Sequence, residues 1–129
     1  MKKLRIGIIG CGGIANQKHF PAMAKNVDLC ELAAFCDIIE DRAKKAAAEH
    51  GIPGAKVYTD YRELLADKTI DVVHICTPNV SHSSIAVDAF SAGKHVYCEK
   101  PMSYNTEEAE KMMTAWKKTN LNRRWPTIF

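Results

Sequence analysis

The sequence of 129 residues lacks the features that mark several common classes of protein. Its five cysteines are odd in number and contain no C-x-x-C pair, so they predict no disulfide framework and fit a reducing cytoplasm. The histidines show no spacing typical of metal ligands, and His74, which shares a strand face with Cys76, is expected to pack in the core. No apolar run approaches the ~20 residues of a membrane span. We therefore expect no metal and no membrane association.

Charge of one sign is also scarce, because the formal net charge is only +3. The one local excess, Lys117, Lys118, Arg123 and Arg124, is typical of a solvated face and carries no nucleic-acid motif. Hydrophobic residues make up 47% of the chain and charged residues 26%, as in an ordinary globular domain. The composition predicts one such domain with no nucleic-acid partner.

The stretch "IGIIGCGGIAN", residues 6–16, permits two interpretations. Residues 8–11, Ile-Ile-Gly-Cys, look like the lipidation site of a bacterial lipoprotein. An export signal, however, needs an apolar stretch of about 7–15 residues before its cleavage site, and Arg5 leaves only residues 6–10. The other interpretation, a glycine turn for a dinucleotide, is the one we expect.

Short apolar runs alternate with amphipathic stretches along the chain. Strands are predicted over 4–10, 30–37, 56–59, 71–78 and 95–101, and helices over 14–25, 40–51, 60–67, 81–93 and 106–119. Asp60 and Glu63 have the spacing of a capping box, and Gly51 and Gly93 are expected to end helices. Nearly continuous apolar strands predict a parallel sheet covered on both faces. The expected fold is α/β: a Rossmann-type, doubly wound, three-layer αβα domain over residues 1–119, followed by an atypical tail over 120–129.

The glycine turn lies where the first strand gives way to a helix. In such turns the first glycine permits the tight bend, the second lets the backbone approach a pyrophosphate, and a small third residue lets helix and strand pack closely. The pyrophosphate then rests on free N–H groups at the start of the helix. The candidate residues are Gly10, Gly12, Gly13, Ile14 and Ala15.

Asp37 supports this interpretation independently, because it ends the second strand 22 residues after Ala15. About 20 residues separate the turn from the acid that binds the ribose 2′-hydroxyl in NAD-binding domains. The alternative is an aspartate that only caps the next helix. A carboxylate there repels a 2′-phosphate, which favours NAD over NADP. Arg42 is expected to face solvent, although a swing toward that phosphate would permit NADP.

Two further strand ends reach the same edge of the predicted sheet. Thr77, Pro78 and Asn79 follow the fourth strand beside the glycine turn, and His82 is either a surface cap or a pocket residue. The fifth strand delivers Glu99, Lys100 and Pro101. A lysine at this position can bind a substrate hydroxyl and assist proton movement during hydride transfer, unless it is simply a surface lysine.

The segments "GIIGCGGIA", "CD" at 36–37 and "TPNVSHSSIAVDAFSAGKHVYCEKP" at 77–101 closely resemble the Gfo/Idh/MocA oxidoreductases. The resemblance, over residues 3 to about 119, implies an NAD(P)-dependent sugar or polyol dehydrogenase. It implies that the turn, Asp37, residues 77–79 and His82 hold the nicotinamide cofactor. It places Glu99 and Lys100 beside the nicotinamide and substrate, with a Lys100–Pro101 bond that is often cis. Lys100 would then be catalytic, together with a histidine from a second domain.

Members of that family are much longer, and we expect this chain to lack their carboxy-terminal substrate domain. The last residues, "NLNRRWPTIF", do not read as the sixth strand that a family member should have. They resemble the product of a truncated or frameshifted gene, or an unusual domain boundary. We expect the fifth strand to be an exposed edge that favours self-association. The chain should bind cofactor without efficient turnover; the alternative is a stand-alone nucleotide-binding module without catalysis.

Overall fold

Five parallel strands organise the part of the chain that this computed structural model describes, residues 2–98 and 105–119. Their order is β3-β2-β1-β4-β5, so β1 lies between β2 and β4 and the order reverses at that point. The strands are β1 (Leu4–Ile9), β2 (Cys30–Cys36), β3 (Lys56–Tyr58), β4 (Val72–Ile75) and β5 (His95–Cys98). This confirms the predicted doubly wound, Rossmann-type sheet.

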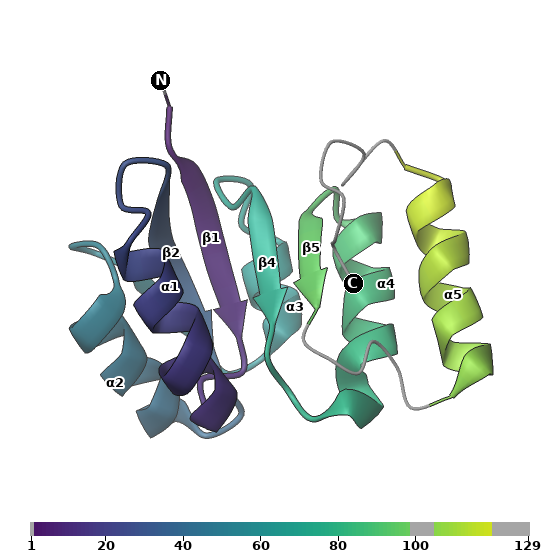
Figure 1. Cartoon of the computed structure of the whole chain (residues 1–129), viewed down its shortest axis with the longest axis horizontal. Helices are drawn as coiled ribbons and strands as arrows, with labels where there is room; N and C mark the ends of the chain where they lie inside the picture. The colour runs from purple at the N-terminus through teal and green to yellow at the C-terminus, as the bar shows by residue number, and fades with distance from the viewer. Residues whose placement is uncertain (1, 99–104, 120–129) are drawn as a thin grey trace.

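Helices cover the sheet on both sides (Figure 1). On one side lie α1 (Phe20–Ala24) and α2 (Glu40–His50); on the other lie α3 (Tyr61–Leu65), α4 (His82–Ser91) and α5 (Thr106–Lys117). The helix expected over 14–25 begins with a π-helical turn, η1 (Ala15–His19), and α4 follows a 3₁₀ turn, η2 (Asn79–Ser81). In Figure 1 the strands run downward, so their carboxyl ends form the lower edge of the sheet.

Each face of the sheet has its own apolar core, which explains why the strands are apolar throughout rather than alternating. On β1, Ile8 packs toward α1 and α2, and Ile9 packs toward α3 and α4. Phe20 and Phe35 meet edge to face in the first core, with ring centroids 5.9 Å apart. The sheet therefore holds its carboxyl edge rigidly between two packed layers.

The helix ends follow the predictions in part. Asp60 caps α3, but its Oδ1 accepts from the N–H of Arg62 at 3.0 Å and not from that of Glu63. Gly93 follows α4 in the left-handed conformation, with φ +80°. Gly51 caps the end of α2 as predicted, but its backbone is extended, with φ −77°. A Cβ there would lie 2.7 Å from the Ala47 carbonyl oxygen, so this glycine provides space and no left-handed turn.

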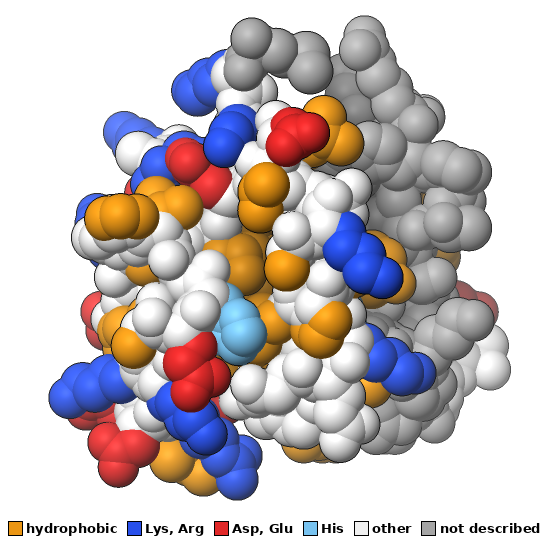
Figure 2. Space-filling view, turned by 60° about the vertical axis from the view of Figure 1, so that its left-hand side comes forward, with side chains coloured by type: hydrophobic (Ala, Val, Ile, Leu, Met, Phe, Trp, Pro, Cys, Tyr) orange, Lys and Arg blue, Asp and Glu red, His pale blue; other side chains and the backbone are white. Residues whose placement is uncertain are grey.

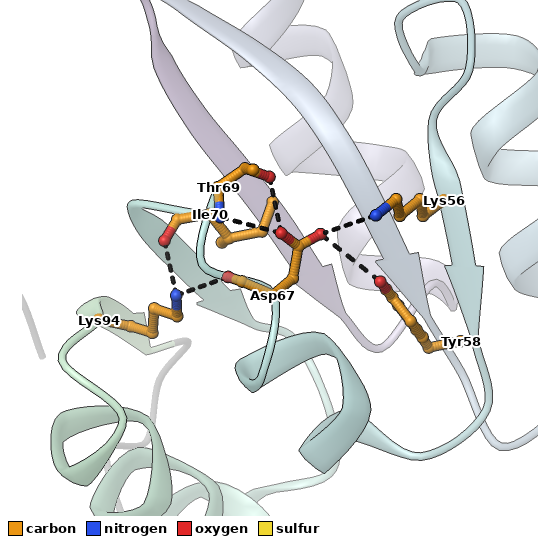
Figure 3. A network of polar contacts seen from close by, with 6 residues as sticks. All are labelled: Lys56, Tyr58, Asp67, Thr69, Ile70 and Lys94. Atoms are coloured by element: carbon orange, nitrogen blue, oxygen red, sulfur yellow. Dashed lines mark hydrogen bonds and ion pairs between the residues drawn. The ribbon is translucent and has the colours of Figure 1, made fainter.

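A polar network stabilises the opposite, amino-terminal edge of the sheet (Figure 3). The buried Lys94 donates through Nζ to the carbonyl oxygens of Asp67 and Ile70, at 2.7 and 2.8 Å. The Asp67 carboxylate accepts from the backbone N–H and hydroxyl of Thr69, at 2.9 and 2.7 Å, and lies 3.7 Å from Lys56 Nζ. Burial lowers the pKa of Lys94. The loop between α3 and β4 is thus tied to the start of β5.

Lys94→Met should therefore lower the free energy of unfolding by about 2 kcal/mol, because two carbonyl groups lose a charged donor in a buried site. Lys56→Met is the matched control, since the Lys56 side chain is 62% exposed and exposed ion pairs contribute about 0–1 kcal/mol. Urea unfolding of both variants measures the difference. Equal unfolding midpoints for the two variants would show that Lys94 contributes no more to stability than the exposed Lys56.

Charged and hydrophobic side chains share the face of the molecule shown in Figure 2. Lysines and arginines lie among acidic residues around exposed hydrophobic side chains on this face. Within residues 2–98 and 105–119, no helix has both the length and the apolarity needed to span a membrane.

Candidate functional site

The glycine turn begins directly after β1, where Gly10 has φ +96°. Its N–H donates to the Cys36 carbonyl at 2.8 Å. A Cβ on Gly10 would lie 2.8 Å from the carbonyl carbon of Cys76, which follows β4. Only glycine satisfies both the left-handed backbone and this close approach. The turn is therefore packed directly against the end of β4, at the point where the strand order reverses.

Two side chains form hydrogen bonds to the backbone of the turn. Asp37 Oδ2 accepts from the Cys11 N–H at 2.9 Å. Asn16, from η1, donates through Nδ2 to the carbonyl oxygens of Cys11 and Gly12, at 3.1 and 2.8 Å. Sequence reasoning did not find Asn16; its only signal is a position four residues after Gly12. These hydrogen bonds restrain the backbone of the turn at Cys11 and Gly12.

A cavity opens over this turn at the carboxyl edge of the sheet. A Cβ on Gly13 would meet nothing within 4 Å, and one on Gly12 would meet only Arg42 Nη1, at 3.7 Å. The two glycines thus present bare backbone to open space, as a phosphate-binding turn requires. The cavity also reaches the loop after β2, the start of α3 and the loop after β4; its lining includes Asp37, Ile38, Ile39, Arg42, Tyr61, Thr77, Pro78, Ser81 and Ile85.

Asp37 lies at the end of β2 with only 8% of its surface exposed. Besides the bond from Cys11, its Oδ1 accepts from the N–H of Ile39, the residue before α2, at 2.8 Å. The carboxylate thus fixes the start of α2 and also lines the cavity. Each carboxylate oxygen can accept more than one hydrogen bond, so capacity remains for a hydroxyl donor from a ligand.

Arg42 faces solvent, as expected, and its side chain also reaches the cavity. It is exposed, but its guanidinium reaches back over Gly12 and lines the cavity. The neighbouring Ile38 and Ile39 are 89% and 46% exposed and also line it. This rim therefore combines two apolar side chains with one cation above the glycine turn, beside the Asp37 carboxylate. Such a surface suits a flat ring joined to an anionic group.

The loop after β4 forms the other wall of the cavity. Thr77 and Pro78 line it, and Ser81 donates through Oγ to Thr77 Oγ1 or to the Pro78 carbonyl, at 2.8 and 2.9 Å. His82 was expected at the surface or in the pocket, and it is in neither place. It is 1% exposed, and its Nε2 lies 2.7 Å from the Thr77 carbonyl oxygen. Since a carbonyl only accepts, Nε2 carries the proton and His82 supports Thr77 from below.

The remaining predicted site residues have these positions. Ile14 lines the cavity, Ala15 is fully buried below the turn, and Asn79 begins η2. Glu99, Lys100 and Pro101 lie outside the described residues, so the expected catalytic lysine stays a prediction. Burial, reinforced by the Asp37 charge, raises the pKa of both Cys11 and Cys36 to about 12. These two thiols are therefore protonated at neutral pH and act as packing groups beside the turn.

Residues 4–123 match the sequence profile of the GFO_IDH_MocA family, described as an oxidoreductase family with an NAD-binding Rossmann fold. The chain belongs to this family. Among curated members, the inositol 2-dehydrogenase of Salmonella typhimurium (strain LT2) is 37% identical over 115 residues, which are 89% of this chain and 34% of that protein. The chain thus spans about a third of the length of the curated relatives that it matches.

Solved structures of two oxidoreductases superpose closely on this chain. The 3-ketoreductase KijD10 of Actinomadura kijaniata, in complex with NADP and TDP-benzene, is 31% identical with a TM-score of 0.84, over 93% of this chain and 36% of that one. The dehydrogenase WlbA of Bordetella pertussis, in complex with NADH and UDP-GlcNAcA, is 32% identical with a TM-score of 0.84, over 91% and 35%. Structural relatives thus bind either NADH or NADP, and the family resemblance seen in the sequence is confirmed.

Proposed function

We propose that residues 1–119 form the dinucleotide-binding domain of an NAD-dependent oxidoreductase that acts on a sugar or polyol. One observation carries the proposal: the glycine turn is fastened by Asp37 and Asn16, and it presents the bare backbone of Gly12 and Gly13 to a cavity. A pyrophosphate needs this arrangement, because a side chain on either glycine would occupy its place.

Asp37 favours NAD over NADP. Its carboxylate would accept from the adenosine ribose hydroxyls, and a 2′-phosphate in the same place would meet a buried negative charge. Arg42 acts in the opposite direction, since its guanidinium lines the same cavity and can pair with a phosphate. We therefore infer that NAD binds more tightly and that NADP binds measurably. Ile38 and Ile39 would flank the adenine, and Thr77, Pro78 and Asn79 would lie beside the nicotinamide half, with His82 behind them.

The reaction proposed is hydride transfer between a secondary alcohol carbon and the nicotinamide, which supplies the hydride acceptor when bound. Lys100 would bind the reacting hydroxyl and help move its proton, with Glu99 and Pro101 fixing its approach. The name of the inositol 2-dehydrogenase relative supports a polyol substrate. The cysteine usage supports a cytoplasmic location, and β5, at the end of the described sheet, is the edge through which copies would associate.

The second candidate is a nucleotide-binding module without catalysis. It is favoured by the cavity itself, whose described lining comes from the turn, the Asp37 loop, the start of α3, the loop after β4 and the start of α4, all local to this domain. The test is an assay of NADH formation by the 129-residue polypeptide with NAD and a panel of polyols. We expect binding without turnover above background. Sustained turnover by this polypeptide alone would exclude the module and show that its own residues complete the active site.

A further inference from the structure

The π-helical turn η1 contains His19, whose contact with a second histidine has no role in the cofactor site described above. A π turn is rare and is usually found at functional positions; here the N–H of Phe20 donates to the Ala15 carbonyl. Within η1 only Ala15 and His19 are buried. His19 Nδ1 lies 3.0 Å from Nδ1 of His74, a residue of β4 that is 55 positions away in the sequence. Both residues are 6% exposed.

The contact between His19 and His74 restricts which ring nitrogens carry a proton. A hydrogen bond between two Nδ1 atoms requires that one ring carries its proton on Nδ1 and that the other presents a lone pair there. The accepting ring, when neutral, therefore carries its proton on Nε2. Tyr97, on β5, keeps both rings in place: it stacks on His74, with centroids 5.0 Å apart, and meets His19 edge to face at 5.5 Å. The His19–His74 hydrogen bond ties η1 to β4, and the ring contact of His19 with Tyr97 ties it to β5.

The same turn holds the phosphate-binding backbone, since Asn16 lies three residues before His19 and donates to the carbonyls of Cys11 and Gly12. The other two residues of η1, Gln17 and Lys18, are exposed. We propose that the His19–His74 pair is a positioning device that anchors η1 to the sheet and thereby sets the conformation of the glycine turn and its affinity for NAD. This inference rests on the proposed function. Neither histidine lines the cavity, so the effect acts through Asn16.

Two substitutions of His74 separate the hydrogen bond from the packing. His74→Phe keeps a ring for Tyr97 but removes the nitrogen, and should weaken NAD binding at least about 10-fold. His74→Asn places an amide near the Nδ1 position and should stay within about 3-fold of the unmodified chain. His50→Phe is the control, because His50 also stacks on a neighbour of the turn, Phe20, at 4.4 Å but belongs to α2. Calorimetry measures affinity, and circular dichroism verifies the fold.

A second readout keeps the two proposals apart. Nitrogen-15 NMR of the unmodified chain should show one of the two rings protonated at Nδ1 and the other at Nε2, and His74→Phe should speed amide exchange at residues 11–14. If the chain binds no NAD, the proposed function fails, and the NMR spectra alone then test whether the His19–His74 pair anchors η1. Unchanged NAD affinity in His74→Phe, or unchanged amide exchange at residues 11–14, would overturn the proposed positioning role of the pair. If His74→Phe does not fold, His19→Phe removes the same bond from the other side.

Discussion

Asp37→Ala is expected to weaken NAD binding about 100-fold, since two or more hydrogen bonds to a charged group contribute about 1.5–3 kcal/mol each. The loss has two parts. The ribose hydroxyls lose their acceptor, and the Cys11 N–H, now bonded at 2.9 Å, loses the contact that fixes the turn. The affinity for NADP should fall less, because the repulsion of a 2′-phosphate disappears with the charge and Arg42 remains. The ratio of the two dissociation constants, measured by calorimetry, should move toward NADP.

Asp41→Ala provides the control for this substitution. Asp41 is an exposed acid in the first turn of α2, close to Asp37 in sequence but absent from the cavity lining. It should leave both dissociation constants within about 2-fold, since an exposed charge contributes little. Equal losses in the two variants would mean that net charge, and not the position of the Asp37 carboxylate, governs binding.

Gly10→Ala should have the largest effect on stability, a loss of about 3–5 kcal/mol, which approaches the whole stability of many domains. The left-handed backbone at φ +96° costs about 1–2 kcal/mol for an L-residue with a side chain. The larger part is steric, because the new Cβ would lie 2.8 Å from the Cys76 carbonyl carbon and 2.9 Å from its oxygen. These are backbone atoms of the end of β4, so relief requires β1 and β4 to separate.

Gly54→Ala measures the cost of the left-handed backbone conformation without a steric clash. Gly54 also has positive φ, +81°, but a Cβ there would meet nothing within 4 Å. It should cost only about 1–2 kcal/mol. Thermal and urea unfolding of both variants give the comparison. Equal destabilisation would contradict the close packing of the turn on β4, which the site depends on.

The fold was predictable because its signals are local and repeated. Continuous apolar runs such as 32–36 require cover on both faces, and the glycine turn and Asp37 stand at the ends of the first two strands. Parallel connectivity then places the loop after β4 beside the turn. The two cores around Ile8 and Ile9 show that this reasoning used the right physical cause.

What the sequence did not reveal depends on contacts between distant segments. One extra residue in the first turn of a helix changes η1 from α to π without altering any local pattern, so the meeting of His19 with His74 is not visible in the sequence. The positions of the Arg42 and His82 side chains were likewise not predictable from the sequence alone. A helix period indicates whether a side chain starts toward solvent, but a long side chain can reach back, and a histidine can turn inward toward a carbonyl such as that of Thr77.

A calorimetric titration of the 129-residue chain with NAD, NADP and ADP-ribose tests the central claim most directly. We predict saturable binding with one site, tighter for NAD than for NADP. ADP-ribose should retain most of the affinity, because the glycine turn, Asp37 and the neighbouring isoleucines are proposed to hold the adenosine diphosphate half. No heat of binding at millimolar NAD, with the chain folded, would show that the fastened turn and its open glycines do not form a cofactor site in this polypeptide.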